Sequence, residues 1–330
     1  EAPDLHGDLR ALLGRRWVVD AGSLAEMRTD RSGLIARGTA VGVAEAESTE
    51  EVSEILRLAS RHGVPVVPRG AGSGLAGGAA AGEGELVLSL ARMDRILEID
   101  PVDQLARVQA GVINSELDAE ARRLGLRYAP DPASRAISTI GGNIATNAGG
   151  LLCAKYGVTR EAVLGLVAVL PDGRVLRTGR RTIKGVTGYD LTALLTGSEG
   201  TLAVITEATL RLVPRPSVPP VTLGAILPSL GEALRLCAEI QREGQQPSLL
   251  ELLDPRCVVA ITEYLEADRL PGPFAALKGA PLGPAVVITQ WDAEGARVAA
   301  DRVERLVAGL GGRSLLLEGE DEGEALLEVR

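Results

Sequence analysis

A glycine-rich stretch, PRGAGSGLAGGA at residues 68–79, constrains the fold of this 330-residue chain more than any other feature. Gly72, Gly74 and Gly77 have the G-x-G-x-x-G spacing that binds dinucleotides in Rossmann folds. Apolar periodicity and capping residues predict that the stretch follows a β-α-β unit, with a strand at 41–46, a helix at 48–63 and a strand at 64–68. The glycine loop is therefore expected at the carboxyl end of a strand.

The surroundings of the loop do not suit a Rossmann fold, in which the last glycine opens a helix. Gly77 is followed by GAAAGEGE and then by a predicted strand that starts near Leu86, which leaves too few residues for a crossover helix. Asp100 lies where a ribose-binding acid would fall, but without that helix the match is accidental. The stretch has no Gly-Lys-Ser/Thr, which excludes a P-loop. Two interpretations remain: a nest of backbone amides that binds an anion, and a flexible surface loop.

A second segment favours the anion nest. STIGGNIATNAGG at 138–150 again combines glycines with small polar side chains and very few charges. Both segments lie close to predicted strand ends, which is hard to explain by two independent linkers. They predict opposite walls around one extended ligand, with one wall holding phosphate and the other packing on a flat ring.

The proline cluster PRPSVPP at 214–220 predicts a domain boundary, and the length of the chain also favours two domains. Before the boundary we expect strands at 85–90, 95–100 and 105–111, a helix at 114–124, a hairpin at 164–178 and a pair of strands within 197–214. After it we expect strands at 221–227, 248–253, 285–290 and 314–318, and helices at 230–243, 255–266 and 293–308. With 255–266 as an insertion, the order is the β-α-β-β-α-β of ferredoxin-like folds.

Composition excludes several classes of function. A net charge of −9 and an aromatic content of 2% argue against a nucleic-acid partner. Three cysteines, Cys153, Cys237 and Cys257, are too few and too far apart for a disulfide framework, an iron–sulfur site or a zinc site, and they suit a reducing cytoplasm. The longest apolar run, AVLGLVAVL at 162–170, is too short to span a bilayer. We therefore expect a cytoplasmic protein with no metal and no membrane span.

Five motifs occur in an order that resembles one family: PRGAGSGLAGGA, DPAS, STIGGNIATNAGG, KYG and GYDLTALLTGSEGTLAVITEATL. The chain is similar to flavoproteins with the vanillyl-alcohol-oxidase-type (PCMH-type) FAD domain, above all the glycolate oxidase D subunit and the D-lactate and D-2-hydroxyglutarate dehydrogenases. The resemblance implies an α+β fold with an N-terminal arm at 1–39, a two-subdomain PCMH-type FAD-binding domain at 40–215, and a partial ferredoxin-like substrate-cap domain at 216–330. The cap is expected to be incomplete at its C-terminus, because GEDEGEALLEVR at 319–330 begins an amphipathic helix.

The resemblance also implies the residues of a cofactor site. The FAD pyrophosphate would be wrapped by Arg69, Gly70, Ala71, Gly72, Ser73, Gly74 and Leu75. The flavin and ribityl side would be lined by Pro130, Asp131, Ser134, Thr139, Gly141, Gly142, Asn143, Ala145 and Thr146. The other end would be closed by Glu199, Gly200 and Ile205, although a hairpin turn and a core strand position also explain these three. Ser73 stands in the loop where relatives with covalent flavin carry histidine, so the FAD is expected to be non-covalent.

The activity implied is FAD-dependent oxidation of a D-2-hydroxy acid, of the glycolate or D-lactate class, to the 2-oxo acid by hydride transfer to flavin N5. In the family the base lies in a HxGDGNxH-like segment and an arginine just before it holds the substrate carboxylate. Neither is found in residues 1–330, where His6 and His62 are the two histidines, so the catalytic residues stay unknown. The chain is either an N-terminal piece of a longer enzyme, which we favour, an FAD-binding or electron-transfer subunit of a multi-subunit glycolate oxidase, or an enzyme that uses other residues.

The expected partners are a small 2-hydroxy acid as substrate and, as further candidates, a second flavin subunit and an iron–sulfur subunit. Through such partners the protein would lie peripherally on the inner membrane. The sequence leaves open which acid is oxidised, the electron acceptor and the oligomeric state. A peptidoglycan-precursor reductase and an ether-lipid synthase use the same kind of domain but match these loops less well. A nicotinamide-dependent dehydrogenase is disfavoured by the missing crossover helix.

Overall fold

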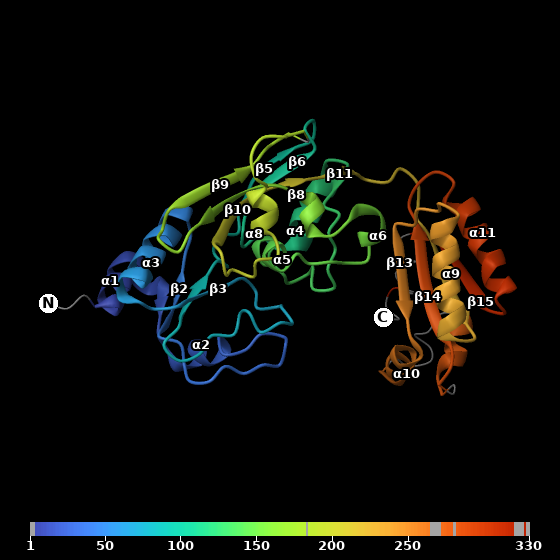
Figure 1. Cartoon of the computed structure of the whole chain (residues 1–330), viewed down its shortest axis with the longest axis horizontal. Helices are drawn as coiled ribbons and strands as arrows, with labels where there is room; N and C mark the ends of the chain where they lie inside the picture. The colour runs from blue at the N-terminus through green and yellow to red at the C-terminus, as the bar shows by residue number, and fades with distance from the viewer. Residues whose placement is uncertain (1–3, 183, 265–271, 280–281, 320–326, 328–330) are drawn as a thin grey trace. The chain divides into compact units, whose positions relative to one another are not determined.

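The computed structural model describes residues 4–182, 184–264, 272–279, 282–319 and 327 (Figure 1). The chain divides into two compact units. Unit 1 comprises Glu1–Gly150 and Gly157–Arg215, and unit 2 comprises Leu151–Tyr156 and Pro216–Arg330. The division after Arg215 falls within the proline-rich segment 214–220. The short segment Leu151–Tyr156 interrupts unit 1 in the sequence but packs with unit 2.

The first sheet of unit 1 contains a parallel core that ends at the glycine loop. Its strands lie in the order β1-β2-β4-β3, with bounds Trp17–Val18, Gly42–Glu45, Leu86–Ser89 and Val66–Arg69. Both β2 and β3 are parallel to β4, which lies between them, and β1 is antiparallel to β2. Helix α3 (Thr49–His62) connects β2 to β3; Ser48 caps its N-terminus and Gly63 ends it in the left-handed conformation. The predicted β-α-β unit is therefore present, with β4 inserted at its centre.

The prediction that residues 1–39 form a separate arm is wrong for the described part of this segment. It contains α1 (Leu5–Leu13), the 3₁₀ turn η1 (Gly14–Arg16), β1 and α2 (Ala21–Glu26). Leu5, Leu9 and Leu13 are buried in the same apolar cluster as residues of α3 and the first sheet. These leucines lie four residues apart and so share one face of the helix. The segment therefore forms part of the core of unit 1.

The second sheet of unit 1 is antiparallel, in the order β5-β6-β10-β8-β9, with bounds Ile96–Asp100, Leu105–Gln109, Val204–Arg211, Val163–Val169 and Val175–Gly179. Strands β8 and β9 form the predicted hairpin around Gly173, whose φ is 81°. The predicted pair of strands within 197–214 differs: only β10 joins this sheet, and the short β11 (Val213–Pro214) pairs with β7 (Leu126–Arg127). Residues 197, 199 and 200 all have positive φ, which prevents an extended strand there.

Four further helices of unit 1 pack with this sheet: α5 contacts β10, α7 contacts β8, α8 contacts β8 and β9, and α4 shares its apolar cluster. Their bounds are Asn114–Arg123 for α4, Ile140–Thr146 for α5, Thr159–Ala162 for α7 and Leu191–Leu195 for α8. Helix α5 lies inside the Gly/Asn-rich segment, where the sequence predicts no helix. Thr139 caps its N-terminus through the amide of Gly142, and Asn147 ends it in the left-handed conformation. Two glycines in its first turn lower the helix propensity and hide the helix from sequence patterns.

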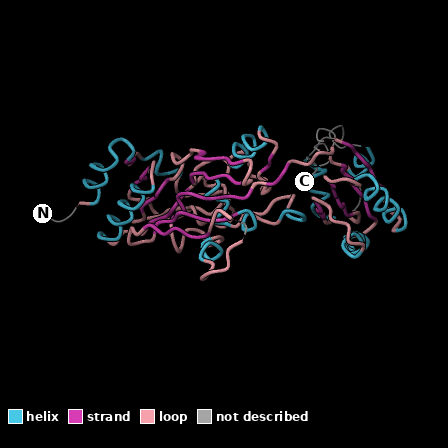
Figure 2. Tube along the Cα trace, turned by 90° about the horizontal axis from the view of Figure 1, so that it is seen from above, coloured by secondary structure: helices cyan, strands magenta, loops and turns pink. Residues whose placement is uncertain are grey.

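Helix α3 also brings the two sheets of unit 1 together. The apolar cluster around Ile55 of α3 includes Leu86 of β4 as well as Val169 of β8 and Val204 of β10. The strands of both sheets are seen from a second direction in Figure 2. Because the helix packs on both sheets, the loop after β3 and the segments that precede β10 come close together. None of the helices in the described part of the chain is long and apolar enough to cross a membrane.

Unit 2 has the predicted split β-α-β-β-α-β arrangement, because its antiparallel strands lie in the order β13-β14-β12-β15. The strand bounds are Leu249–Leu253, Ala285–Trp291, Val221–Leu227 and Arg313–Glu318. The helices are α6 (Cys153–Tyr156), α9 (Leu230–Arg242), α10 (Pro255–Tyr264), the 3₁₀ helix η3 (Gly272–Leu277) and α11 (Ala296–Gly309). One apolar cluster joins α9 and α11 to the sheet, and a second joins α10, η3 and Leu151 to it. Residues 265–266 of the predicted helix 255–266, and most of the predicted helix at 319–330, lie outside the described residues.

Candidate cofactor site

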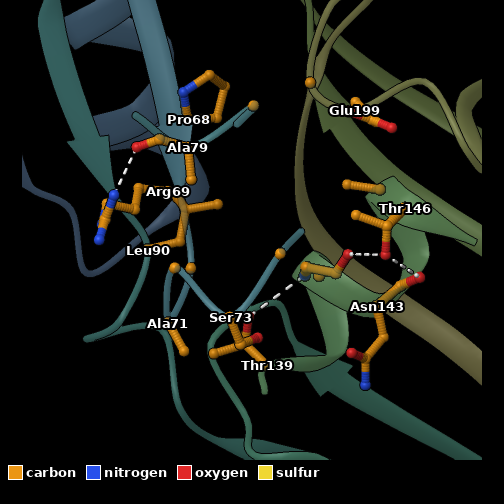
Figure 3. Close-up of a pocket in the computed structure, with 18 of the residues that line it drawn as sticks. Pro68, Arg69, Ala71, Ser73, Ala79, Leu90, Thr139, Asn143, Thr146 and Glu199 are labelled. Carbon is orange, nitrogen blue, oxygen red and sulfur yellow. Dashed lines mark hydrogen bonds between the residues drawn. The ribbon is translucent and has the colours of Figure 1, made fainter. Parts of the chain in front are cut away.

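Three segments of unit 1 surround a cavity of about 440 Å³. The first is the glycine loop after β3, the second runs from Ser134 through α5 to Ala148, and the third comprises 199–205 at the start of β10. Figure 3 shows the first wall with Pro68, Arg69 and Ala79, and the facing walls with Asn143, Thr146 and Glu199. The two glycine-rich segments therefore form opposite sides of one cavity, as the sequence predicts.

The side chain of Arg69, the last residue of β3, bridges the two ends of the glycine loop. Its Nη1 donates to the carbonyl oxygen of Ala79 at 2.5 Å, which joins the start of the loop to its end (Figure 3). Gly72 packs directly on this guanidinium: it has a φ of +65°, and a Cβ there would lie 2.4 Å from Arg69 Nη2. Burial lowers the pKa of Arg69, and the nearby charges of Asp30 and Glu26 oppose that effect. At Gly72 the loop therefore has room only for backbone, which packs against the Arg69 guanidinium.

The second wall approaches the loop so closely that a glycine is required. A Cβ on Gly70 would lie 2.3 Å from Oγ1 of Thr139, the residue that caps α5. Within α5, Thr139 Oγ1 accepts the amide of Gly142 at 3.3 Å and Thr146 Oγ1 donates to the carbonyl oxygen of Gly142 at 3.1 Å. Asn143 is 3% exposed, and its Nδ2 has no hydrogen-bond partner among the described residues. This wall therefore offers the cavity a buried donor.

The third wall is bonded to α5 through the backbone. The amide of Glu199 donates to Ala145 at 2.8 Å and that of Gly197 donates to Ile144 at 2.9 Å. Glu199 has a φ of 50°, and its Oε2 would lie 3.1 Å from a Cβ on Gly78 of the glycine loop. Gly200 approaches Pro68 in the same way, because a Cβ added to Gly200 would lie 3.0 Å from Pro68 Cγ. The three walls thus meet through glycines and leave little side-chain bulk at their junctions.

The residues predicted for the cofactor site line this cavity, with two exceptions. The lining includes Arg69, Gly70, Ala71, Gly72, Ser73, Gly74, Leu75, Ser134, Thr139, Gly141, Gly142, Asn143, Ala145, Thr146, Glu199, Gly200 and Ile205. Pro130 and Asp131 are not among the residues that line this cavity. The carbonyl oxygen of Pro130 instead accepts Asn114 Nδ2 at 3.1 Å, and Asp131 packs against Gly150, whose Cβ would lie 2.3 Å from Asp131 Oδ1. Contact of the lining residues with a cofactor stays a prediction.

Sequence reasoning missed other lining residues: Asp30, Pro68, Ala76, Gly78, Ala79, Leu90, Ala110, Ala148, Ala203 and Val204. Most are sequence neighbours of predicted ones, so that wider windows around the motifs would include them. Asp30, Leu90 and Ala110 are remote from the motifs, and no pattern in the sequence marks them.

Neither histidine lines the cavity. The ring of His6 lies 5.5 Å from that of Trp17, and His62 Nε2 lies 3.5 Å from Asp8 Oδ2. Among the residues that the structure describes, no group of three or more histidine, cysteine, aspartate or glutamate side chains could hold a metal ion. The chemistry that the cavity offers is therefore that of amides, hydroxyls and a few charged groups.

These groups fit a dinucleotide flavin. The charged side chains of the lining are Asp30, Arg69 and Glu199, so a diphosphate would be held mainly by the amides of the glycine loop. The glycine contacts make a cradle that a Cβ would fill at Gly70 and Gly72. Asn143 Nδ2, a buried donor of the lining, has no hydrogen-bond partner among the described residues and can donate to an acceptor of a ligand.

The fold and the cavity define a flavoprotein. Residues 40–179 match the family model described as an FAD binding domain, so this part of the chain is an FAD-binding domain. It is 46% identical over 217 residues to "Glycolate oxidase subunit GlcD" of Bacillus subtilis (strain 168), a match that covers 66% of this chain and 46% of the relative. It is 45% identical over 228 residues to a D-lactate dehydrogenase of Archaeoglobus fulgidus, covering 69% and 50% of the two chains.

A third relative is the D-2-hydroxyglutarate dehydrogenase of Xanthomonas citri pv. viticola, with 39% identity over 253 residues, 77% of this chain and 51% of the relative. The chain thus matches about half the length of these curated relatives. Two solved structures share the fold. Alkyldihydroxyacetonephosphate synthase superposes with a TM-score of 0.81 at 20% identity, over 100% of this chain and 65% of that one. p-Cresol methylhydroxylase superposes with a TM-score of 0.81 at 19% identity, over 98% and 68%.

Proposed function

We propose that the protein containing this chain oxidises a D-2-hydroxy acid, of the glycolate or D-lactate class, to the 2-oxo acid with non-covalently bound FAD. The observation that carries the proposal is the cavity formed by the glycine loop, α5 and residues 199–205, because it combines an amide nest with a buried donor, Asn143 Nδ2, that has no partner among the described residues. The names of the relatives, which include a glycolate oxidase subunit and two dehydrogenases of 2-hydroxy acids, support this substrate class.

Within this proposal the residues of unit 1 bind and orient the cofactor. Bound FAD supplies the acceptor for the substrate's hydride. The amides of residues 70–75 hold the diphosphate, and Asn143 Nδ2 donates to an acceptor on the flavin side. The hydroxyls of Thr139 and Thr146 are bonded within α5 and fix that wall. The lining contains no histidine, which supports non-covalent attachment.

The proposal assigns no catalytic base or substrate-binding arginine within residues 1–330. His6 and His62 do not line the cavity, and Arg69 packs against Gly72 while its Nη1 donates to Ala79 within the glycine loop. By analogy with the relative named a glycolate oxidase subunit, we propose a second flavin-binding subunit and an iron–sulfur subunit as partners. Such a complex would place the protein in the cytoplasm or peripherally on the inner membrane.

The visible spectrum of the purified protein tests the proposal. We expect flavin absorption after reconstitution with FAD, and release of the flavin on denaturation in acid. In the full-length gene product, glycolate, D-lactate or D-2-hydroxyglutarate added without oxygen should bleach the flavin bands. One of the three acids should do so fastest. Retention of FAD without bleaching by any of them would favour an electron-transfer subunit. The absence of flavin binding would refute the proposal.

A further inference from the structure

The KYG motif at residues 155–157 is the one motif of the five that contributes no residue to the cavity lining, among the residues that the structure describes. It overlaps Leu151–Tyr156, the short segment that packs with unit 2 although the chain on both sides of it belongs to unit 1. The residues that line the cavity all belong to unit 1. Any part that the motif plays in cofactor binding is therefore indirect.

This segment is the tip of a loop that starts and ends at the wall formed by α5. Asn147 ends the helix, and the next residue, Ala148, lines the cavity. Where the chain returns, the amide of Thr159 donates to the carbonyl oxygen of Ala148 at 3.1 Å, and the Thr159 hydroxyl donates to the same oxygen at 2.8 Å. The amide of Arg160 donates to Asn147 Oδ1 at 2.9 Å. These bonds fix the base of residues 149–158, which we call the strap, to the end of α5.

The tip of the strap is anchored in unit 2. Leu151 is 8% exposed and belongs to the apolar cluster that joins α10 and η3 to the sheet. Lys155 Nζ lies 2.6 Å from Asp292 Oδ1, and the hydroxyl of Tyr156 donates to Oδ2 of the same carboxylate at 2.8 Å. The tip is thus held by a buried apolar contact, an ion pair and a hydrogen bond.

Only two residues on each side, 149–150 and 157–158, connect the base of the strap to its tip. Gly150 packs on the backbone of Asp131, because a Cβ on Gly150 would lie 2.4 Å from the Asp131 carbonyl carbon. Gly157 has a φ of +78°, and a Cβ there would lie 2.6 Å from Glu161 Cγ. Both connections are short and packed, so they leave little slack between the end of α5 and the tip.

We propose that the strap couples occupation of the cavity to the docking of its tip, so that cofactor binding in unit 1 also stabilises unit 2. The inference rests on the proposed binding of FAD to this cavity. Helix α5 has seven residues and two glycines in its first turn, so its intrinsic stability is low. A ligand that binds only the ordered wall stabilises this helix and, through the bonds at its end, the base of the strap. Coupling is reciprocal, so a loosened tip must weaken FAD binding by the same factor.

The first test measures FAD affinity, by quenching of flavin fluorescence, in the wild type, Lys155→Met, Tyr156→Phe and the control Val303→Ala. The first two variants loosen the tip, whereas Val303 is buried in the other apolar cluster of unit 2 and its truncation weakens that core away from the strap. We expect the Kd to rise about fivefold or more in Lys155→Met, less in Tyr156→Phe, and not at all in Val303→Ala.

Circular dichroism identifies the conditions in which each variant is folded, and Tyr156→Phe decides the outcome if Lys155→Met does not fold. An unchanged Kd in the folded tip variants, or an equal rise in Val303→Ala, would overturn the inference. Failure of the wild type to bind FAD would instead refute the proposed cofactor.

A second test follows the unfolding of unit 2 in urea through the emission wavelength of Trp291, in a Trp17→Phe background. Saturating FAD should raise the urea midpoint of unit 2. The rise should be smaller in Thr159→Val, which removes one bond at the base of the strap, and complete in Thr192→Val, which removes a buried hydroxyl of unit 1 that donates to Thr178. A midpoint of unit 2 that does not respond to saturating FAD, or an equal response in both threonine variants, would overturn the inference.

Discussion

The hydroxyl of Thr49 donates to Oγ1 of Thr206 at 2.9 Å, between two buried side chains that are 157 residues apart in the sequence. Thr206 in turn donates to the carbonyl oxygen of Val167 at 3.2 Å. Thr49 begins α3, which belongs with the first sheet, whereas Thr206 and Val167 lie on adjacent strands of the second. This chain of hydrogen bonds ties together the two halves of unit 1 that surround the cavity.

We predict that Thr206→Val lowers the free energy of unfolding of unit 1 by about 1–3 kcal/mol, because it leaves a buried donor on Thr49 and a buried acceptor on Val167. The double variant Thr49→Val/Thr206→Val should lose less than the sum of the single variants, since it also removes the orphaned donor. Urea unfolding of all three variants measures this. Strict additivity would show that the two hydroxyls act independently.

The glycine loop leads to a second prediction, on FAD retention. Gly72→Val should abolish it, because the backbone there has a positive φ and any Cβ collides with the guanidinium that closes the loop. Gly74→Val should also abolish it, for a different reason: Gly74 has open space, with Asp30 Oδ2 at 3.9 Å as its nearest neighbour, so the valine would fill the cavity without disturbing the loop. The flavin content of the purified variants is the measurement.

Gly125→Ala is the matched control for strain. Gly125 has a φ of +73° but open space around its Cβ, and it does not line the cavity. It should cost about 1 kcal/mol of stability and leave the flavin content unchanged. Full flavin content in Gly72→Val would contradict the assignment of this loop to the cofactor.

A third prediction concerns the ion pair between Lys155 and Asp292 in unit 2. Lys155 Nζ lies 2.6 Å from Asp292 Oδ1, and the hydroxyl of Tyr156 donates to Oδ2 at 2.8 Å. The Asp292 side chain is 5% exposed and that of Lys155 is 29% exposed. Lys155→Met should therefore destabilise unit 2 more than Asp292→Asn, by about 1–3 kcal/mol, because it leaves a buried carboxylate without its cation, whereas a Lys155 side chain that has lost the carboxylate reaches water.

The two tryptophans of the chain make this measurable. Trp291 adjoins Asp292 in unit 2 and Trp17 lies in unit 1, so the Trp17→Phe background reports the unfolding of unit 2 alone by fluorescence. The reverse order of stability between Lys155→Met and Asp292→Asn would show that the carboxylate is not the costly partner.

A fourth prediction concerns the pH dependence of stability. Arg16 donates to both carboxylate oxygens of Glu51, each at 2.5 Å, and this hydrogen bonding holds the pKa of Glu51 below its usual value of 4.5. Because the folded pKa is lowered, the stabilisation is fully present above pH 4.5 and is lost as the pH falls through the folded pKa. Glu51→Gln should therefore cost about 1 kcal/mol at pH 7 and almost nothing near pH 2.

Thermal unfolding of Glu51→Gln and of the exposed neighbour variant Glu50→Gln across this range provides the comparison. Glu50→Gln should stay close to the wild type at every pH. A stability difference for Glu51→Gln that does not shrink on acidification would exclude the ion pair as its source.

Periodic segments with clear ends could be predicted closely from the sequence. The helix expected at 48–63 is Thr49–His62, because Ser48 and Gly63 supply local signals for both ends. The four strands and two main helices of unit 2 were predictable for the same reason. Helix α5 was not, because its glycines conceal a helix that depends on the cap at Thr139 and on packing with β10. The N-terminal segment was misjudged because its short helix is stabilised by tertiary burial rather than by propensity.

The same difference between local sequence signals and tertiary contacts applies to the residues of the candidate site. The residues 69–75 and most of 134–146 could be found from consecutive motif letters. Asp30 could not, because it reaches the cavity through backbone pairing between segments about 50 residues apart. Pro130 and Asp131 do not line the cavity, although their local sequence is similar to the rest of the motif, and the Pro130 carbonyl oxygen accepts a hydrogen bond from Asn114. Local patterns identify a loop, but which distant residue completes it depends on topology.

The detour of Leu151–Tyr156 into unit 2 has a consequence for synthesis on the ribosome. Lys155 and its partner Asp292 are 137 residues apart, so at ribosomal rates of about 5–20 residues per second the segment waits roughly 7–27 s for its partner to be made. During that interval Leu151, which ends in the core of unit 2, is exposed on a nascent chain whose first 150 residues are already available to fold. The window for misassembly or chaperone capture is therefore set by the order of translation, and slower translation of the region before Asp292 would lengthen it.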